Sequence, residues 1–504
     1  MKIFNAEQIR ALDAYTISQE PIASVDLMER AARVCHGKII KKIKPSQRVM
    51  VLCGPGNNGG DGLVICKYLL QNQFNAFAVL PDLGRERSED AQFHYLQLLQ
   101  EYPEKIIEVK DEESLLALFG EENTLVVEAL FGSGLNKPLS GFAAELVRCV
   151  NAKASVIFSV DMPAGLYTDK AVDKDDAVIE ADVTFTFQHP KLAMMMAENA
   201  RFVGHFEVLN IGLHPKAIEQ MPADYFFVEK ALITSLLKKR VKHAHKGMYG
   251  HGLLLAGSKG KSGAALLAAR ACLKSGAGLL TVHGVKETLA ANLITLPEAM
   301  SSEDPHPAHI SDIAHLEKYT AVGIGPGIGT HDDTAAVLKK LLHYYNGPLV
   351  LDADALNILS ENKTWLNFLP PNSILTPHPK EFERLSEKHS NSYDRLSALR
   401  LFAMRHKSII ILKGAYSAIA MPDGHVFFNS SGNAGMAKGG SGDVLTGMIL
   451  GLLARGYNAP QAALIGTYVH GYAADLLAKK TSLESMLASE VIDKIGRAFL
   501  KISA

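Results

Sequence analysis

The stretch GPGNNGGDG, residues 54–62, follows a short apolar run at 49–53 and precedes a helix-like segment. Its first, third and sixth residues match the fingerprint G-x-G-x-x-G in the order strand, loop and helix, which predicts an α/β fold that binds a dinucleotide. The same loop carries Asn57, Asn58 and Asp61. A loop that only cradles pyrophosphate uses backbone N–H groups, and a carboxylate beside the phosphates would repel them. We therefore expect the loop to bind something other than an ordinary dinucleotide.

The composition is typical of a globular protein that acts on small molecules. Its 504 residues predict two domains, and a net charge of −1 gives no reason to expect nucleic acid or an anionic membrane as a partner. The five cysteines form no C-x-x-C pair, which argues against disulfides or a zinc site. Nothing at the start resembles a signal peptide, and no apolar run is long enough to cross a bilayer. We expect a cytoplasmic homo-oligomer.

Two α/β patterns follow one another along the chain. Apolar strand-like runs alternate with helical spacing up to about residue 212, and the alternation starts again at HGLLLAGS, residues 251–258. This alternation predicts parallel sheets that are covered on both faces. The pattern breaks at 210–225, and a basic run follows at 238–247. We interpret this region as a domain boundary with a solvated basic edge, although the run could also attract phosphate.

The stretch NAGMAKGGSGDVLTGMILGLL, residues 433–453, is the most informative part of the second half. Its small residues lead into Asp443 and then into an amphipathic helix, so backbone N–H groups and the helix dipole point to one place beside a carboxylate. This arrangement suits a base that removes a hydroxyl proton during phosphoryl transfer. In the alternative interpretation, Asp443 only caps the helix.

Two further strand ends in this half carry charged residues. In IIILKGAYS, Lys413 and Gly414 could meet a nucleotide phosphate, and in VLDADALN, Asp352 and Asp354 could hold Mg²⁺ through waters. Either aspartate could instead be a helix N-cap. The GKS within KGKSG (259–263) is not a P-loop, because the first glycine of that motif is missing.

In the first half, three strand ends bring oxygen ligands together. They are GPGNNGGDG, VVEALFGSGLNKP (126–138) and SVDMPAGL (159–166). The side-chain oxygens of Asn58 and Glu128, with carbonyls near Ala164, make an all-oxygen set of low charge that suits a hard cation better than zinc. Asp161 is placed to move a proton, or alternatively to cap the turn before Pro163.

These motifs together resemble the bifunctional NAD(P)H-hydrate repair enzymes of bacteria and archaea, over nearly the whole chain. GPGNNGGDG and VDMPAG are specific for the epimerase half, and HKGMYGHGLLLAGS, LDADALN, TPHPKEFERL, LKG and NAGMAKGGSGD for the dehydratase half. The resemblance implies a Rossmann-like three-layer epimerase domain at 1–214 and a ribokinase-like, ADP-dependent dehydratase domain at 224–504. The first would interconvert the R and S hydrates of NADH or NADPH, and the second would dehydrate the S form.

The resemblance also implies roles for individual residues. The hydrated nucleotide would bind in the epimerase half to Asn57, Asn58, Gly59, Gly60, Asp61, Gly132, Ser133, Gly134, Leu135, Asn136, Lys137 and Pro138. Asp161 would touch the altered ring, and K⁺ would be held by Asn58, Glu128 and Ala164. In the dehydratase half the substrate would meet Ala264, Gly327 and His378. ADP, with Mg²⁺, would meet Lys413, Gly414, Ala415, Tyr416, Ser417 and Gly442, and Asp443 would be the catalytic base.

The chain departs from the family pattern at three places. Glu128 stands where the family usually has Asp, Ala164 where it has Ser, and Lys380 where it has Gly. The first change lengthens an expected K⁺ ligand by one methylene. Ala164 can offer only its carbonyl oxygen.

Three other functions remain as alternatives from the sequence. A ribokinase-like small-molecule kinase with a non-catalytic Rossmann-like binding domain would share the anion site and Asp443, but it would release a stable phosphorylated product. The first half could also be a scaffold without activity. An NAD-dependent oxidoreductase would rest on the glycine fingerprint and on Asp82 as the ribose ligand.

Overall fold

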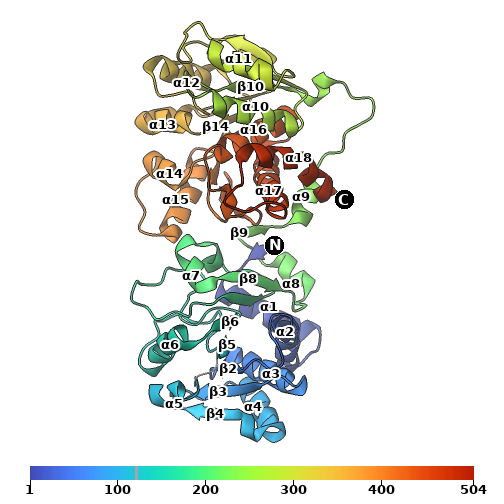
Figure 1. Cartoon of the computed structure of the whole chain (residues 1–504), viewed down its shortest axis with the longest axis vertical. Coiled ribbons are helices and arrows are strands. Elements are labelled where there is room, and N and C mark those ends of the chain that lie inside the picture. The colour runs from blue at the N-terminus through green and yellow to red at the C-terminus, as the bar shows by residue number, and fades with distance from the viewer. Residues whose placement is uncertain (120–122, 504) are drawn as a thin grey trace. The chain divides into compact units, whose positions relative to one another are not determined.

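The computed structural model describes residues 1–119 and 123–503, and the chain divides into two compact units, residues 2–223 and 224–504 (Figure 1). Each unit has its own β-sheet and its own buried core. Helices lie along both faces of each sheet, which is the layered arrangement that parallel strands require.

The sheet of the first unit is parallel throughout, in the order β4-β3-β2-β5-β6-β7-β8. Its strands are β2 Val49–Cys53, β3 Ala76–Pro81, β4 Ile106–Val109, β5 Leu125–Ala129, β6 Val156–Val160, β7 Val183–Phe187 and β8 His205–Leu209. The three strands β2, β3 and β5 are buried along their whole length, as expected for a sheet covered on both sides.

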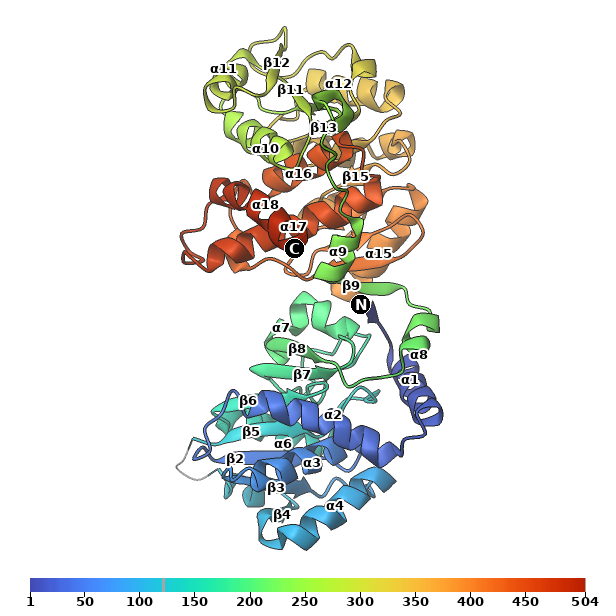
Figure 2. The same ribbon diagram turned by 90° about the vertical axis from the view of Figure 1, so that its right-hand side faces the viewer.

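Two apolar layers sandwich this sheet. Alternate residues of β2 face opposite ways: Val49 and Val51 pack toward α2 and α3, whereas Met50 and Leu52 pack toward α5 and α6. Figure 2 shows α2 and α3 in front of the sheet. The unit begins with the short strand β1 Lys2–Ile3, and its helices are α1 Ala6–Gln19, α2 Ser24–Ile39, α3 Asn57–Gln71, α4 Glu89–Glu101, α5 Glu112–Leu116, α6 Phe142–Lys153, α7 Ala200–Val203 and α8 Pro215–Gln220.

The glycines of the 54–62 loop are required by close backbone contacts. A Cβ at Gly59 would lie 1.7 Å from the carbonyl oxygen of Gly54, and a Cβ at Gly54 would lie 2.0 Å from that of Leu130. Helix α3 therefore starts directly against the ends of β2 and β5, with its first N–H groups at the edge of the sheet.

The second unit has a larger mixed sheet, in the order β9-β18-β17-β16-β15-β14-β13-β10-β11-β12. All its neighbouring strands are parallel except β17, which runs antiparallel to β16 and β18. The strands are β9 Tyr225–Val228, β10 His251–Leu255, β11 Leu279–Gly284, β12 Met300–Glu303, β13 Ala321–Ile324, β14 Leu349–Leu351, β15 Ile374–Leu375, β16 Ile409–Leu412, β17 Ala418–Ala420 and β18 Val426–Asn429.

Helices cover this sheet too, with α13, α14 and α15 along one side and α16, α17 and α18 along the other in Figure 1. The helices are α9 Lys230–Leu236, α10 Ser262–Lys274, α11 Lys286–Thr295, α12 Asp332–Tyr344, α13 Asp354–Glu361, α14 Pro379–Leu385, α15 Ser392–Arg405, α16 Ser441–Ala454, α17 Ala459–Ala478 and α18 Ala488–Ser503.

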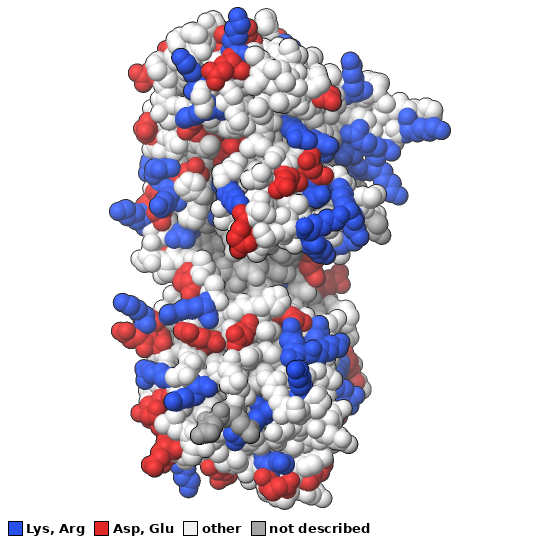
Figure 3. All heavy atoms as spheres, viewed as in Figure 1, with Lys and Arg blue, Asp and Glu red and all other residues white. Residues whose placement is uncertain are grey.

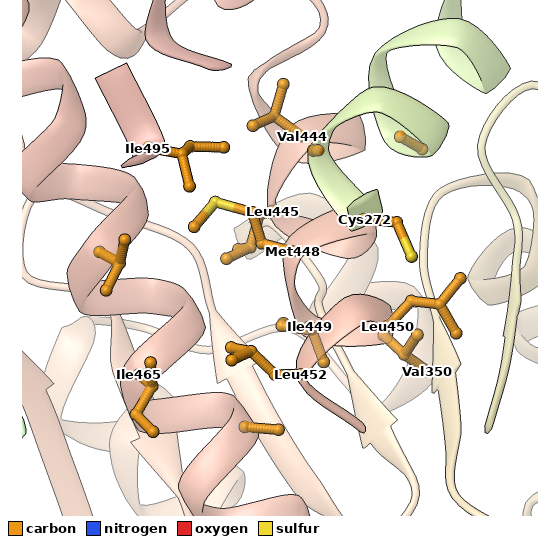
Figure 4. Close-up of a cluster of buried hydrophobic side chains, with 14 of the residues drawn as sticks. Cys272, Val350, Val444, Leu445, Met448, Ile449, Leu450, Leu452, Ile465 and Ile495 are labelled. Atoms are coloured by element: carbon orange, nitrogen blue, oxygen red, sulfur yellow. The ribbon is translucent and has the colours of Figure 1, made fainter. Parts of the chain in front are cut away.

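Helix α16 is the centre of the core of the second unit. Figure 4 shows its Leu445, Met448 and Ile449 directed toward Ile465 of α17 and Ile495 of α18. The helix lies against α10 with almost no space between the backbones. A Cβ at Gly447 would lie 2.0 Å from the carbonyl oxygen of Ala268. This contact holds the N-terminal end of α16, and with it Asp443, in a fixed position.

The region expected to be a boundary contains more regular structure than its sequence suggests. Residues 210–225 were expected to lack periodicity, yet they contain α8, and β9 and α9 follow directly. The basic run at 238–247 is mostly exposed, and Figure 3 shows Lys and Arg side chains gathered over the segment between α9 and β10.

Part of this basic cluster binds the carboxyl ends of two helices. Lys238 donates to the carbonyl of Gly456 just after α16, and Arg240 to that of Gly276 just after α10, at 2.6 and 2.7 Å. Cations at these positions stabilise helix ends. The basic run at 238–247 therefore fits the interpretation as a solvated domain edge better than that as a phosphate-binding site.

The thiols and the helix hydropathy are properties of the whole described chain. All five cysteines are buried and unpaired. Within residues 1–119 and 123–503, no helix combines the length and the apolarity needed to cross a membrane.

We predict opposite effects for two glycine-to-alanine changes in the second unit. Gly447→Ala forces α10 and α16 apart and should lower the free energy of unfolding by about 1–3 kcal/mol. Gly496→Ala, in the interior of α18 with open space around its Cβ position, should raise it by about 0.5–1 kcal/mol. Denaturant unfolding of both variants and the parent measures this; equal stabilities for the two would contradict the close contact.

Candidate functional sites

A cavity of about 580 Å³ opens in the first unit at the carboxyl ends of its strands. Most of the substrate-binding residues expected from the sequence lie in its wall, namely Asn57, Asn58, Asp61, the whole of Gly132–Pro138, and Asp161. Gly59, Gly60, Glu128 and Ala164 do not line the cavity. Gly59 and Gly60 lie in the first turn of α3, where they are buried.

Asp161 is held by groups from two other strand ends. Its carboxylate accepts hydrogen bonds from the N–H of Ser133 at 3.3 Å and the N–H of Phe187 at 3.2 Å. Its backbone lies in the left-handed region, with φ of 63°, which turns the side chain toward the cavity. The alternative that Asp161 caps its own turn is wrong, because its hydrogen-bond donors come from elsewhere in the chain.

Lys191 is a site residue that the sequence analysis missed. Its side chain is only 1% exposed, and its ammonium group pairs with Asp161 and donates to the Thr186 hydroxyl at 2.7 Å. The buried pair explains how a carboxylate is tolerated at the base of the cavity. The signal was the sequence QHPK (188–191) directly after the strand DVTFTF, a fourth strand end in addition to the three considered above.

Two further carboxyl groups face the same cavity. Burial, with Asp161 as the next cause, raises the pKa of Asp61 well above its ordinary value, and the same two effects raise the pKa of Asp13 on α1 to about 7. The shift favours the neutral, protonated form of Asp61. This accounts for an aspartate in a phosphate-type loop, because a neutral carboxyl group donates a hydrogen bond and does not repel an anion.

Glu128 is fully buried under this cavity without a cationic partner. The N–H groups of Leu130 (2.7 Å) and Ala164 (3.2 Å) and the hydroxyl of Ser159 donate to its carboxylate, and burial raises its pKa to about 7. No Lys or Arg in the described parts of the chain pairs with it. In Asn58, the buried amide nitrogen also lacks a hydrogen-bond partner among the described residues.

In the second unit, Asp443 lies in the first turn of α16. The N-cap of this helix is Gly440, with φ of 92°, and no side chain caps it, so the capping alternative for Asp443 is wrong. Burial, followed by the charge of Asp352, raises the pKa of Asp443 to about 6. The carboxylate is thus ionised at neutral pH and is a stronger base than an exposed aspartate.

Lys413, at the end of β16, lies next to Asp443 and Gly442. Its ammonium group is 2.9 Å from the Asp352 carboxylate, and a Cβ at Gly442 would be 3.3 Å from it. Burial alone would lower the pKa of Lys413, but nearby carboxylates, Asp352 foremost, outweigh it and raise the pKa. The Thr446 hydroxyl donates to the other oxygen of Asp352 at 2.7 Å. The absence of a side chain at Gly442 thus leaves room for the Lys413 ammonium group beside the N-terminal end of α16.

The two aspartates of VLDADALN have separate partners. Asp352 binds Lys413, whereas Asp354 accepts the N–H of Gly329 at 2.8 Å and pairs with Lys261 at 3.3 Å. The N-cap of α13 is the residue between them, Ala353, so neither aspartate is the cap.

The other expected residues of this half lie around the same strand ends. Ala264 and Gly327 are neighbours, since a Cβ at Gly327 would lie 3.2 Å from that of Ala264. His378 caps α14 and contacts Glu381, which in turn lies 3.8 Å from the Lys413 ammonium group. Glu381 is thus a second residue missed by the sequence analysis, although TPHPKEFERL contains it.

The expected nucleotide residues 413–417 form the tight connection between β16 and β17. The Ser417 hydroxyl donates to the carbonyl of Gly414 at 3.1 Å and accepts from its N–H at 3.2 Å. Ala415 and Tyr416 form the tip of this connection. The loop therefore presents a compact backbone surface beside Lys413.

Comparisons with known proteins match both units. Residues 252–497 match the family model described as NAD(P)H-hydrate dehydratase, and residues 24–193 match the model described as YjeF-related protein N-terminus. The bifunctional NAD(P)H-hydrate repair enzyme Nnr of Moorella thermoacetica is 34% identical over 98% of this chain and 96% of its own length. That of Coxiella burnetii is 31% identical, over 97% of each chain.

A solved structure of the ADP/ATP-dependent NAD(P)H-hydrate dehydratase from Bacillus subtilis, co-crystallized with ATP/Mg²⁺, also resembles this chain. It is 32% identical, with a TM-score of 0.49, and the match covers 55% of this chain and 98% of that one.

The fold class expected from the sequence, a Rossmann-like unit followed by a ribokinase-like unit, is confirmed by the two family models and the sheet topology. The full-length matches support the expected family over a kinase with an inactive binding domain. The chain belongs to the bifunctional NAD(P)H-hydrate repair enzymes.

Proposed function

We propose that this chain repairs hydrated NADH and NADPH with two separate active sites. The first, in the range 1–214, epimerises the R and S hydrates, and the second, in the range 224–504, dehydrates the S form at the expense of ADP. The observation that carries this proposal is that each unit has its own aspartate beside a lysine at the strand ends. Asp161 pairs with the buried Lys191, and Asp443 lies near Lys413.

In the dehydratase, Asp443 takes the proton of the C6 hydroxyl as this oxygen accepts the terminal phosphoryl group of ADP, which leaves as AMP. Phosphate then departs from C6 and a proton from C5, which restores the double bond of the ring. Lys413 and the N–H groups at the start of α16 stabilise the charge on the phosphate. The compact loop 413–417 holds the nucleotide, and Ala264, Gly327 and His378 surround the ring.

Mg²⁺, when bound with the nucleotide, supplies further neutralisation of the phosphate charge. Asp352 and Asp354 fit this role, because each has a carboxylate at a strand end and each still has free lone pairs for a water-mediated contact. The separate partners of the two aspartates hold them apart and favour contact through waters.

In the epimerase, C6 of the substrate carries both a hydroxyl group and the ring nitrogen. Departure of the hydroxyl as water leaves a planar carbon that water can attack from either face. Asp61, whose pKa burial raises well above its ordinary value, is suited to give the proton that the departing hydroxyl needs, and Asp161 to take one from the incoming water. Lys191 pairs with Asp161 at the base of the cavity.

A monovalent cation such as K⁺ fits the polar group beneath this cavity. Among residues 1–119 and 123–503, the buried carboxylate of Glu128 has no counter-ion and a buried terminal atom of the Asn58 amide has no hydrogen-bond partner. The oxygen and nitrogen of an amide side chain are told apart only by their hydrogen-bond partners. If the Asn58 amide is turned over, its oxygen takes the position of the unpartnered atom and can bind a cation. The Ala164 carbonyl accepts from Ile179 at 2.9 Å and keeps one lone pair for a cation.

Location and assembly follow from surface and thiol chemistry. Five unpaired thiols support a reducing compartment, and we place the enzyme in the cytoplasm. Leu293 and Ile294 on α11 are 64% and 82% exposed, which favours a homo-oligomer in which they are covered.

Incubation of the full-length protein with a mixture of the two hydrated NADH epimers tests the reaction directly. With ADP, both epimers should disappear and NADH absorbance should return; without ADP, the epimers should only interconvert. A stable phosphorylated product would instead indicate a kinase.

Replacement of Asp443 by Asn should lower dehydration by about 10² to 10⁴, the usual cost of losing a general base. Epimerisation should be unchanged, because Asp443 belongs to the other unit. Since its pKa is about 6, dehydration by the parent enzyme should rise as the pH increases through that value, when the base becomes ionised. The matched control is Asp493→Asn on α18, and near-normal NADH recovery in Asp443→Asn would overturn the assignment.

Epimerisation by the full-length protein in K⁺, Na⁺ or Mg²⁺ buffers tests the cation. We expect the highest rate in K⁺ and a loss of the K⁺ effect in Glu128→Gln, with Glu128→Asp retaining part of it. Glu108→Gln, an exposed carboxylate on β4, should behave as the parent. Equal rates in all buffers and no loss in Glu128→Gln would show that Glu128 holds no ion.

A further inference from the structure

A cluster of histidines in the second unit has no part in the proposed reaction. His309, in the segment that follows β12, lies beside His331 and Asp333 at the start of α12. One nitrogen of His309 is 3.0 Å from the Asp333 carboxylate, and one of His331 is 3.5 Å from the same oxygen. The three candidate ligand atoms all lie within 4.8 Å of one another.

The two segments that carry these side chains are already fixed to each other. The Thr334 hydroxyl of α12 donates to the carbonyl of Ile310 at 2.8 Å, and Lys340 pairs with Asp312 at 2.8 Å. Asp304, which is 4% exposed, binds the backbone of the first segment through the N–H groups of His306 and Ser311, both at 2.8 Å. The cluster therefore sits on a rigid frame and needs little ordering to bind a ligand.

The ring arrangement keeps the imidazoles close together. The ring centroids of His306 and His309 are 3.7 Å apart, and those of His309 and His331 are 3.9 Å apart, in stacked orientation. The stack therefore holds the two candidate ligand rings, those of His309 and His331, side by side. The His309 side chain is 13% exposed, whereas Asp333 is open to solvent and leaves an entry path.

The donor set selects the kind of metal. Two imidazoles and one carboxylate favour Zn²⁺ and similar divalent transition metals over Mg²⁺ and Ca²⁺, which prefer oxygen ligands. Around tetrahedral zinc, with bonds of about 2.0–2.1 Å, neighbouring ligand atoms lie roughly 3.4 Å apart. The 3.0 Å between Nε2 of His309 and the Asp333 oxygen is close to that value. Three protein ligands leave a fourth position for water.

We propose that His309, His331 and Asp333 form a site for one divalent transition metal ion, with Zn²⁺ as the best fit, separate from the nucleotide-bound Mg²⁺. The Nδ1 atom of His331 accepts the N–H of Asp333 at 3.2 Å, so its Nε2 atom is the one that binds the metal. His309 binds through Nε2, the atom that faces the Asp333 carboxylate. The ion would join the 304–313 segment to the start of α12. His331, one of its ligands, lies two residues after Gly329, whose N–H donates to Asp354.

Calorimetric titration of untagged, chelator-treated full-length protein with Zn²⁺ tests the site. We expect one ion per chain, no competition from excess Mg²⁺, and binding at least tenfold weaker in His309→Gln and in Asp333→Asn. Because a ligand that binds only the folded state stabilises it, Zn²⁺ should also raise the melting temperature of the parent but not of His309→Gln.

Two matched variants distinguish this site from other histidines. His315→Gln alters an exposed histidine outside the cluster and should bind Zn²⁺ as the parent does. His306→Gln removes a stacking neighbour and no ligand atom, so it should keep the stoichiometry. Parent protein that binds Zn²⁺ no more tightly than His309→Gln, or variants that all bind alike, would overturn the proposal.

Discussion

The common direction of the strands is the constraint on which both sites depend. In each unit, parallel strands deliver their carboxyl ends to one edge of the sheet, so that loops far apart in sequence meet there. Asp161 and Lys191 come from the ends of β6 and β7, and Asp352 and Lys413 from the ends of β14 and β16. Because the strands themselves are buried, the charges at their ends are partly buried too, and each must find a partner.

The acids at these strand ends differ in their partners. A lysine pairs with Asp161 in one unit and with Asp352 in the other. Asp61 and Asp443 have no such ion pair with any residue that the structure describes, and burial raises the pKa of each. Proton donors and acceptors of different strength therefore arise from one residue type, through differences in burial and neighbouring charge.

Much of this arrangement could be predicted from the sequence. The apolar runs at β2, β5 and β6 predicted their strands correctly, and the glycine-rich stretch before Asp443 placed that residue at a helix start. The expected loop at 54–62 is shorter than predicted, because α3 begins at Asn57 and Asn58 lies in its first turn. Other features depend on contacts that no local pattern carries. Strand β15 has only two residues and lies between proline-containing segments, so it is too short to show a strand pattern. Lys191 pairs with Asp161, which lies 30 residues before it in the sequence. The raised pKa of Asp61 comes from burial, which motif spacing cannot supply.

The central claim is that two independent sites act in series, and mixing two variants that each lack one activity tests it most directly. Asp161→Asn and Asp443→Asn are purified separately and then combined with ADP and a mixture of R and S hydrates. Our account predicts that Asp161→Asn alone recovers only the S form, that Asp443→Asn alone recovers almost no NADH, and that the mixture recovers both forms completely. A mixture that still leaves the R hydrate unrepaired would contradict it.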